Sequence, residues 1–217
     1  MYNAHRICID IQAAISPDEC LIYSFGYDGN WSFEELMENY GCRVYTFDHK
    51  LKELGDHQHS SNITFHLLGL SNQDSTAVVV GKAGITGITQ FKSLATIYNM
   101  LVPDHGEKNI DYLKIEPEFV GAGDEWGIIQ NLVTSGILKK VRQLEILVKY
   151  DPKYSKREQQ NKIRIIKSLE DCGFVRFNSV PHASGNFVNM FDFGEYTAFQ
   201  LSWLNSELTR KFESSQR

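Results

Sequence analysis

The chain has 217 residues, of which 42% are hydrophobic and 23% charged, so it can bury one sizeable core. Its 27 acidic residues outnumber its 22 basic ones, which excludes the positive field that holds nucleic acid non-specifically. No apolar run approaches the length that crosses a bilayer, and no Pro-, Gly- or Ser-rich stretch is typical of a linker. We expect one domain over residues 1–217, with no nucleic-acid partner and no membrane segment; the oligomeric state is left open.

The spacing of the four cysteines indicates whether they bind zinc, form disulfides or remain free thiols. They have no CxxC spacing and no histidine at zinc-finger spacing, so the sequence gives little support to a structural zinc site. Buried free thiols are the simpler interpretation, and a disulfide between Cys8 and Cys20 is the alternative in a secreted protein. The four are Cys8, Cys20, Cys42 and Cys172.

Apolar, β-branched runs alternate with segments of helical period from residue 20 to residue 171. Such alternation favours a largely parallel sheet flanked by helices. Ser32 and Glu35 have the spacing of a capping box at the first helix, and Gly173 follows the last one. The expected strands are residues 20–25, 43–47, 62–68, 77–80, 110–115 and 141–150; the expected helices are residues 32–40, 91–101, 124–135 and 155–171.

The alternation ends after Gly173. Three strand-like runs follow with only turns between them, at residues 174–180, 187–191 and 196–204. In the last run Leu201 and Trp203 face one way while Gln200 and Ser202 face the other. An antiparallel hairpin that closes a parallel sheet is the layout of class I S-adenosylmethionine-dependent methyltransferases, whereas a plain dinucleotide-binding sheet stays parallel to its edge. We therefore predict a three-layer Rossmann-like α/β sandwich with a mostly parallel seven-stranded sheet.

The turn after the first strand, Ser-Phe-Gly-Tyr-Asp-Gly, is a candidate cofactor loop. Gly26 and Gly29 lack a Cβ, so the backbone can approach a ligand closely. Asp48 ends the second strand 22 residues after Gly26, near the spacing of about 20 at which an acid meets ribose hydroxyls. The turn does not match GxGxxG, and the alternative is an ordinary turn with a solvated acid. Together these residues predict a nucleoside-bearing cofactor.

The fourth main strand ends in acids that would face the same cleft. Glu116 and Glu118 could act as a general base, orient a substrate, or hold a metal. The alternative is that they only cap or solvate the following turn. The segment from Asp56 to His59 is a weaker metal candidate because it lies in a polar loop, so we predict no metal site.

The ordered segments YSFGYDGNWSFEELM, GCRVYTFD, ITFHLLGLSN, IDYLKIEPE, DEW, ILKKVRQLEI and YTAFQLSWLN resemble the methyltransferase-like protein 24 family, related to FkbM-type methyltransferases. The similarity runs over nearly the whole chain. It implies an S-adenosylmethionine pocket, with Gly69, Leu70 and Ser71 on its adenine side and the remaining turn residues beside it. The predicted cofactor-binding residues are Ser24, Phe25, Gly26, Tyr27, Asp28, Asp48, Gly69, Leu70 and Ser71, and the predicted catalytic residues are Glu116 and Glu118.

The chain departs from the family pattern where catalysis would occur. Glu116 stands where the family has Asp, the stretch FVGAGD is extra, and Leu147 stands where the family commonly has His. A longer side chain and a longer loop would displace a catalytic carboxylate. The resemblance therefore supports cofactor binding by this chain more strongly than it supports catalytic activity.

The predicted function is transfer of a methyl group from S-adenosylmethionine to an oxygen or nitrogen of an unidentified acceptor. No Asn-Pro-Pro-Tyr run follows the fourth strand, which disfavours methylation of a flipped base or a glutamine amide. The main alternative is a catalytically impaired pseudo-methyltransferase that acts as a cofactor-binding or interaction module. A nicotinamide-dependent oxidoreductase is disfavoured by the terminal hairpin and the missing third glycine.

The expected compartment follows from two glycosylation sequons, at Asn30 and Asn62. A glycan on Asn30 would obstruct the candidate cofactor loop, so we expect a cytoplasmic chain. A secreted or lumenal location is the alternative if an N-terminal segment precedes this sequence.

Overall fold

The structure is a computed structural model of the chain. It describes residues 5–10, 15–27, 29–49, 55–80, 86–116, 125–149, 154–182, 187–190, 193–196 and 198–209. Asp28 and Glu118, two of the predicted site residues, lie outside this part of the chain.

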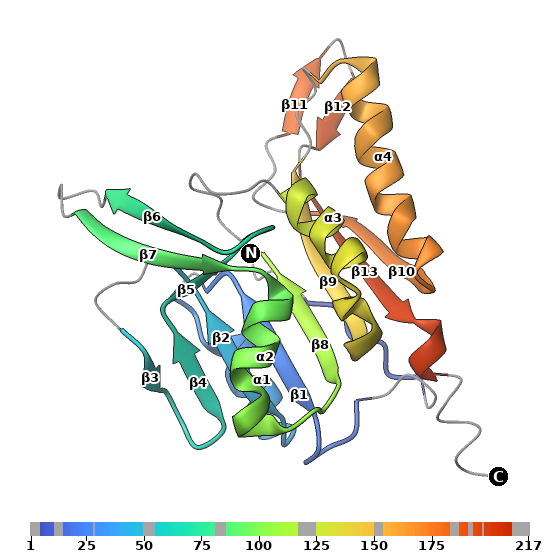
Figure 1. Cartoon of the computed structure of the whole chain (residues 1–217). Coiled ribbons are helices and arrows are strands. Elements are labelled where there is room, and N and C mark those ends of the chain that lie inside the picture. The colour runs from blue at the N-terminus through green and yellow to red at the C-terminus, as the bar shows by residue number, and fades with distance from the viewer. Residues whose placement is uncertain are drawn as a thin grey trace.

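An eight-stranded mixed sheet forms the centre of the fold (Figure 1). Its five inner strands are parallel, while β13 and β10 at one edge and β3 at the other run antiparallel to their neighbours. From one edge to the other the strands are β10 (Phe174–Pro181), β13 (Ala198–Asn205), β9 (Val141–Lys149), β8 (Ile110–Ile115), β1 (Leu21–Phe25), β2 (Arg43–Phe47), β4 (Ile63–His66) and β3 (His57–Gln58). This strand order confirms the predicted class I methyltransferase fold, with β3 added at its edge.

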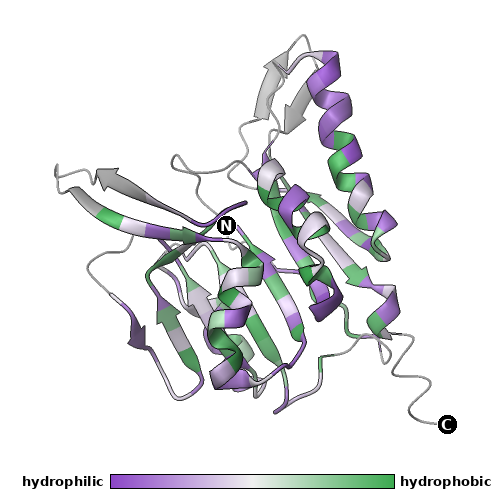
Figure 2. Ribbon diagram, viewed as in Figure 1, coloured by the Kyte–Doolittle hydropathy of each residue, from purple (hydrophilic) through white to green (hydrophobic). Residues whose placement is uncertain are grey.

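Helices cover both faces of the sheet, which gives three layers. The larger apolar core lies between the sheet and α2 (Leu94–His105), α3 (Glu125–Ser135) and α4 (Lys156–Asp171), with the short 3-10 helix η1 (Ile137–Lys140) beside them. The smaller core lies under α1 (Ser32–Asn39) on the opposite face. Hydrophobic residues concentrate along the inner strands, while α4 is largely hydrophilic (Figure 2). Within the described residues, no helix is both long and apolar enough to cross a membrane.

Two smaller sheets accompany the central one. The first joins β5 (Leu68–Leu70), β7 (Thr86–Lys92) and β6 (Ser75–Val80), and the second pairs β11 (Phe187–Met190) with β12 (Phe193–Tyr196). Figure 1 shows β6 and β7 extending beyond the central sheet as an arm. The terminal hairpin therefore differs in detail from the prediction, because β13 inserts between β9 and β10 while β11 and β12 stand apart.

Several element boundaries depend on contacts that the sequence pattern does not reveal. The predicted strand at residues 62–68 is interrupted at Leu67, whose N–H donates to the Asp56 carboxylate (2.8 Å) and so leaves the ladder. The predicted capping box at Ser32 is absent: Ser32 lies inside α1, and its N–H donates to the Asn30 side chain (3.0 Å). A capping box does form at Ser155 and Glu158, where α4 begins.

The expectation of free thiols at every cysteine, and the alternative of a Cys8–Cys20 bond, are both wrong. Cys20 is joined to Cys42, and Cys8 and Cys172 are free. The reason is the register of two parallel strands: Leu21 pairs with Arg43, so the residues immediately before these two start side by side. The Arg43 N–H accordingly donates to the Cys20 carbonyl oxygen (2.9 Å). The disulfide covalently links the amino ends of β1 and β2.

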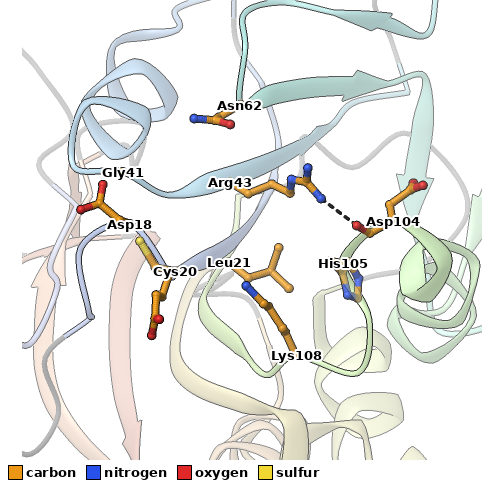
Figure 3. Close-up of a pocket in the computed structure, with 10 residues that line it drawn as sticks. Asp18, Cys20, Leu21, Gly41, Arg43, Asn62, Asp104, His105 and Lys108 are labelled. Atoms are coloured by element: carbon orange, nitrogen blue, oxygen red, sulfur yellow. Dashed lines mark hydrogen bonds between the residues drawn. The ribbon is translucent and has the colours of Figure 1, made fainter.

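A pocket of about 370 Å³ lies beside this disulfide, at the amino ends of the strands (Figure 3). Arg43 spans it and donates to the backbone carbonyl oxygen of Asp104 (2.7 Å). The buried His105 ring lies at its wall: Nδ1 donates to the Gly106 carbonyl oxygen (2.6 Å), which leaves Nε2 to accept from the Tyr23 hydroxyl (2.7 Å). Burial lowers the pKa of His105 below its usual value.

We expect replacement of both bonded cysteines, in Cys20→Ala/Cys42→Ala, to lower the free energy of unfolding by about 3 kcal/mol. The sequence separation of 22 residues defines the loop whose freedom the bond removes from the unfolded chain. Urea unfolding under non-reducing conditions measures the loss. Cys172→Ala is the matched control because Cys172 is a free thiol, and a comparable loss there would contradict a specific effect of the bond.

We expect His105 to make the fold less stable as the pH falls below about 6.5, the usual pKa of histidine. Its folded-state pKa is lowered, so the unfolded chain takes up the proton first and is favoured progressively as the pH drops. Urea unfolding of the wild type and of His105→Gln at pH 7.5 and pH 5.5 measures this. The stability difference between the two proteins should shift in favour of His105→Gln at the lower pH, and identical pH dependence would rule the effect out.

Candidate functional site

Three predicted site residues meet at the carboxyl ends of adjacent parallel strands. Gly26 follows β1, Asp48 follows β2 and Glu116 follows β8. Backbone hydrogen bonds hold them level: the Gly26 N–H donates to Phe47 (3.1 Å), and the Glu116 N–H donates to Phe25 (2.9 Å). This edge is where open α/β sheets bind ligands.

The turn after β1 begins with a glycine of positive φ. Gly26 has a φ of 93°, in the region that glycine adopts at low steric cost. Tyr27 is buried and packs its ring against Trp31 (4.2 Å between centroids) and Phe65 (6.0 Å). Tyr27 and Trp31 thus form one aromatic cluster at the β4 side of the edge, with the His59 ring stacked on Trp31.

A buried carboxylate that the sequence analysis did not single out lies beneath this turn. Glu34, in the first turn of α1, is only 1% exposed and accepts from the Ser24 hydroxyl through Oε1 (2.6 Å). Lys114 Nζ lies 3.6 Å from the same oxygen and 3.8 Å from Glu116 Oε2, so it joins the two carboxylates. Glu34 Oε2 is buried and has no hydrogen-bond partner among the described residues.

Glu116 points into the interior beside a second buried carboxylate. Its Oε1 accepts from the Gln200 amide nitrogen (2.8 Å), which also donates to Glu145 Oε1 (2.8 Å). His5 Nδ1 lies 2.7 Å from Glu145 Oε1 and 3.7 Å from Glu116 Oε1. The N-terminal segment therefore contributes a side chain to the same cluster as the candidate catalytic acid.

Glu145 is completely buried and surrounded by donors. Its Oε2 accepts from the Ser202 hydroxyl (3.0 Å) and from the Arg6 N–H (2.9 Å). Burial raises the pKa of Tyr112 well above its usual value, and the nearby Glu145 carboxylate adds to this shift. The polar face that Gln200 and Ser202 present was expected from their alternation with Leu201 and Trp203; its burial was not.

The remaining predicted residues have mixed placements. Phe25 belongs to the opposite core, where its ring stacks on Phe47 (4.4 Å between centroids). Gly69 lies beside the end of β2, because an added Cβ would come within 3.2 Å of the His49 Cβ and collide with the Phe91 ring. Leu70 packs in the larger core, and the Ser71 N–H donates to Lys92 (2.9 Å). Whether any of these residues contacts a cofactor stays a prediction.

Sequence reasoning missed His5, Glu34 and Lys114, and it included Glu145 only within the segment ILKKVRQLEI that carries the family resemblance. One signal could have found the strand residues: Lys114 and Glu145 are charged residues within largely buried strands, and as register partners they lie on the same face of the sheet. In contrast, the segment from Asp56 to His59 is not the polar loop that the sequence analysis expected, because His57 and Gln58 form β3. Its side chains do not converge, since Asp56 bonds to His66 and His59 bonds to Glu35.

Comparisons with known proteins agree with this architecture. Residues 3–195 match a protein family described as "Methyltransferase domain". The chain is 25% identical over 213 residues to a Homo sapiens protein called "Probable methyltransferase-like protein 24", and the match covers 92% of this chain and 55% of the human one. The chain thus spans about half the length of that relative. The FkbM relationship stays a prediction.

Similar solved structures include a SAM-dependent methyltransferase from Agrobacterium tumefaciens and a putative rRNA-methylase from Clostridium thermocellum. The first is 13% identical with a TM-score of 0.46, covering 90% of this chain and 58% of the other. The second is 10% identical with a TM-score of 0.45, covering 87% of this chain and 89% of the other. The expectation that nucleic acid is not a partner stays a prediction.

The family match covers most of the chain, and the strand order and the similarity to methyltransferase-like protein 24 point the same way. The chain therefore belongs to the methyltransferase domain family.

Proposed function

We propose that this protein binds S-adenosylmethionine and transfers its methyl group to an oxygen or nitrogen of an acceptor that is not yet identified. The observation that carries the proposal is the convergence of Gly26, Asp48 and Glu116 at the carboxyl edge of three adjacent strands. That this chain shares an activity with the longer human relative is part of the same proposal.

The residues at this edge suit the chemical groups of S-adenosylmethionine. The positive φ of Gly26 brings backbone close to the space above β1 without a side chain. The Asp48 carboxylate is of the right type to accept from the two vicinal ribose hydroxyls. The buried Glu34 Oε2, which has no partner among the described residues, is of the right type to accept from an amino group.

When bound, S-adenosylmethionine supplies an electrophilic methyl group on its sulfonium. The protein's own contribution is alignment and exclusion of water. Lys114 and Gln200 hold the Glu116 carboxylate by two different oxygens, and this keeps its direction fixed. Ionised Glu116 could then take the proton from an acceptor hydroxyl or amine.

The alternative, a catalytically impaired binding module, rests on the same contacts. Glu116 is 11% exposed at its side chain, and both of its oxygens already have partners or close cationic neighbours. A carboxylate engaged in this way has fewer open positions at which it can accept a proton from an incoming acceptor. Methyl transfer and cofactor binding therefore need separate measurements.

We also propose an oxidising compartment for the protein, in place of the cytoplasm that the sequence analysis favoured. The Cys20–Cys42 bond supports this, since disulfides persist mainly in secreted and lumenal proteins. The secreted or lumenal alternative thereby becomes the better-supported one.

We expect S-adenosylmethionine and S-adenosylhomocysteine to raise the thermal unfolding temperature, and NAD to leave it unchanged. A ligand at 100 times its dissociation constant stabilises the folded state by about 2.7 kcal/mol. Differential scanning fluorimetry measures the shift, which should shrink strongly in Asp48→Asn. Asp104→Asn is the matched control because Asp104 lines the pocket at the opposite edge of the sheet. If Asp104→Asn loses the shift and Asp48→Asn keeps it, the cofactor binds at the amino ends of the strands and the proposed site is wrong.

We expect the wild type to form S-adenosylhomocysteine when it is incubated with S-adenosylmethionine and a fractionated cell extract as the acceptor source. If Glu116 is the general base, Glu116→Gln should lower kcat by about 10²- to 10⁴-fold. Glu35→Gln, an exposed acid on the same helix as Glu34, should behave as wild type. Binding of S-adenosylhomocysteine without turnover in any fraction would favour the impaired module.

A further inference from the structure

Three potential metal ligands converge beneath the carboxyl edge, on elements far apart in the sequence. They are His5 of the N-terminal segment, Glu116 after β8 and Glu145 in β9. His5 Nδ1 and one carboxylate oxygen of each glutamate all lie within 4.8 Å of one another. One imidazole nitrogen and two carboxylate oxygens form a ligand set that suits divalent transition metals.

The second oxygen of each carboxylate is held by a different group, which fixes how the first one points. Glu145 Oε2 accepts from the Ser202 hydroxyl (3.0 Å) and the Arg6 N–H (2.9 Å), while its Oε1 faces His5. Glu116 Oε2 lies 3.8 Å from Lys114 Nζ, while its Oε1 also faces His5. Outer contacts of this kind orient the ligands of metal sites.

The charges of the cluster do not balance without a cation. Among the described residues, the Lys114 ammonium lies beside two carboxylates, 3.6 Å from Glu34 Oε1 and 3.8 Å from Glu116 Oε2, while the ion-pair neighbour of the Glu145 carboxylate is His5. All four charged side chains, those of Glu34, Lys114, Glu116 and Glu145, are buried or nearly so. One ammonium cannot offset the formal charge of three carboxylates. Burying uncompensated charge is costly, and a divalent ion would neutralise it.

The Gln200 amide nitrogen already lies among the three ligand atoms, as a cationic partner would. It is 2.8 Å from each carboxylate Oε1 and 3.2 Å from His5 Nδ1. A half-turn of the amide group would bring its carbonyl oxygen to this place, and that oxygen is itself a metal ligand. Gln200 is therefore compatible with the cluster both with and without an ion.

We propose that His5, Glu116 and Glu145 bind one divalent transition-metal ion, of the class of Zn²⁺ or Mn²⁺. The proposal is independent of the methyl transfer proposed above. It concerns binding of the ion alone, and the N-terminal segment contributes one of the ligands.

The test is isothermal titration of the full chain with ZnCl₂, MnCl₂ and MgCl₂ after removal of metals with a chelator. We expect one Zn²⁺ or Mn²⁺ per chain, bound at least tenfold more tightly than Mg²⁺. Affinity should fall at least tenfold in both Glu116→Gln and His5→Ala. Glu116→Gln retains an oxygen that can accept from Gln200, and His5→Ala changes only the N-terminal segment, so neither variant depends on rebuilding the sheet.

His59→Ala is the matched control, because His59 also contacts a carboxylate, that of Glu35 (3.2 Å), but lies on the surface. It should bind the ion as the wild type does. The urea midpoint of every variant checks that the fold is intact. Absence of stoichiometric binding by the wild type, or unchanged affinity in folded Glu116→Gln and His5→Ala, would overturn the proposal, whatever the result for S-adenosylmethionine.

Discussion

The completely buried carboxylate of Glu145 is the constraint on which the functional half of the structure depends. A carboxylate inside a central strand is tolerated only when donors surround it, because leaving it unpaired costs several kcal/mol. The donors come from two parts of the chain that are far apart in sequence: Arg6 in the N-terminal segment, and Gln200 and Ser202 in β13. Satisfying Glu145 therefore ties the N-terminal segment and the last strand to β9.

This requirement also gives the two faces of the central sheet different characters. The face under α2, α3 and α4 is apolar and closes around residues such as Trp203 and Leu144. The face under α1 is apolar near the disulfide and becomes polar towards the carboxyl edge, where Lys114 and Glu116 lie. The larger apolar core and the buried polar cluster thus lie on opposite faces of one sheet.

The two proposed roles of Glu116 place competing demands on the direction of its carboxylate. As a general base it needs a free oxygen directed at the acceptor, whereas as a metal ligand it directs Oε1 inwards to His5 and Glu145. Its contacts with Gln200 and Lys114 favour the inward direction. In the second role, the departure from Asp to Glu at this position acquires a physical reason: the longer side chain can reach the interior cluster.

The amino ends of the strands differ from the carboxyl ends in what they contribute to the protein. There the Cys20–Cys42 bond fixes the starts of β1 and β2, and the pocket beside it lies far along the strands from Gly26 and Asp48. Stabilisation at the amino ends and ligand binding at the carboxyl ends is the division expected of an open α/β sheet. A pocket is therefore not by itself a reason to place the chemistry at the amino edge.

The sequence by itself determined the order and type of the main elements, because apolar period and turn residues are local properties of the chain. It located β2 and β8 to the residue, and it indicated Gly26, Asp48 and Glu116 as neighbours, since successive parallel strands end at one edge. Only the tertiary structure decided what depends on contacts between distant segments. The register of β1 against β2 selected Cys42 as the partner of Cys20, and the packing of the N-terminal segment placed His5, 140 residues away in sequence, against Glu145. No local pattern encodes such pairings, because they arise when the sheet closes and the buried charges must find their partners.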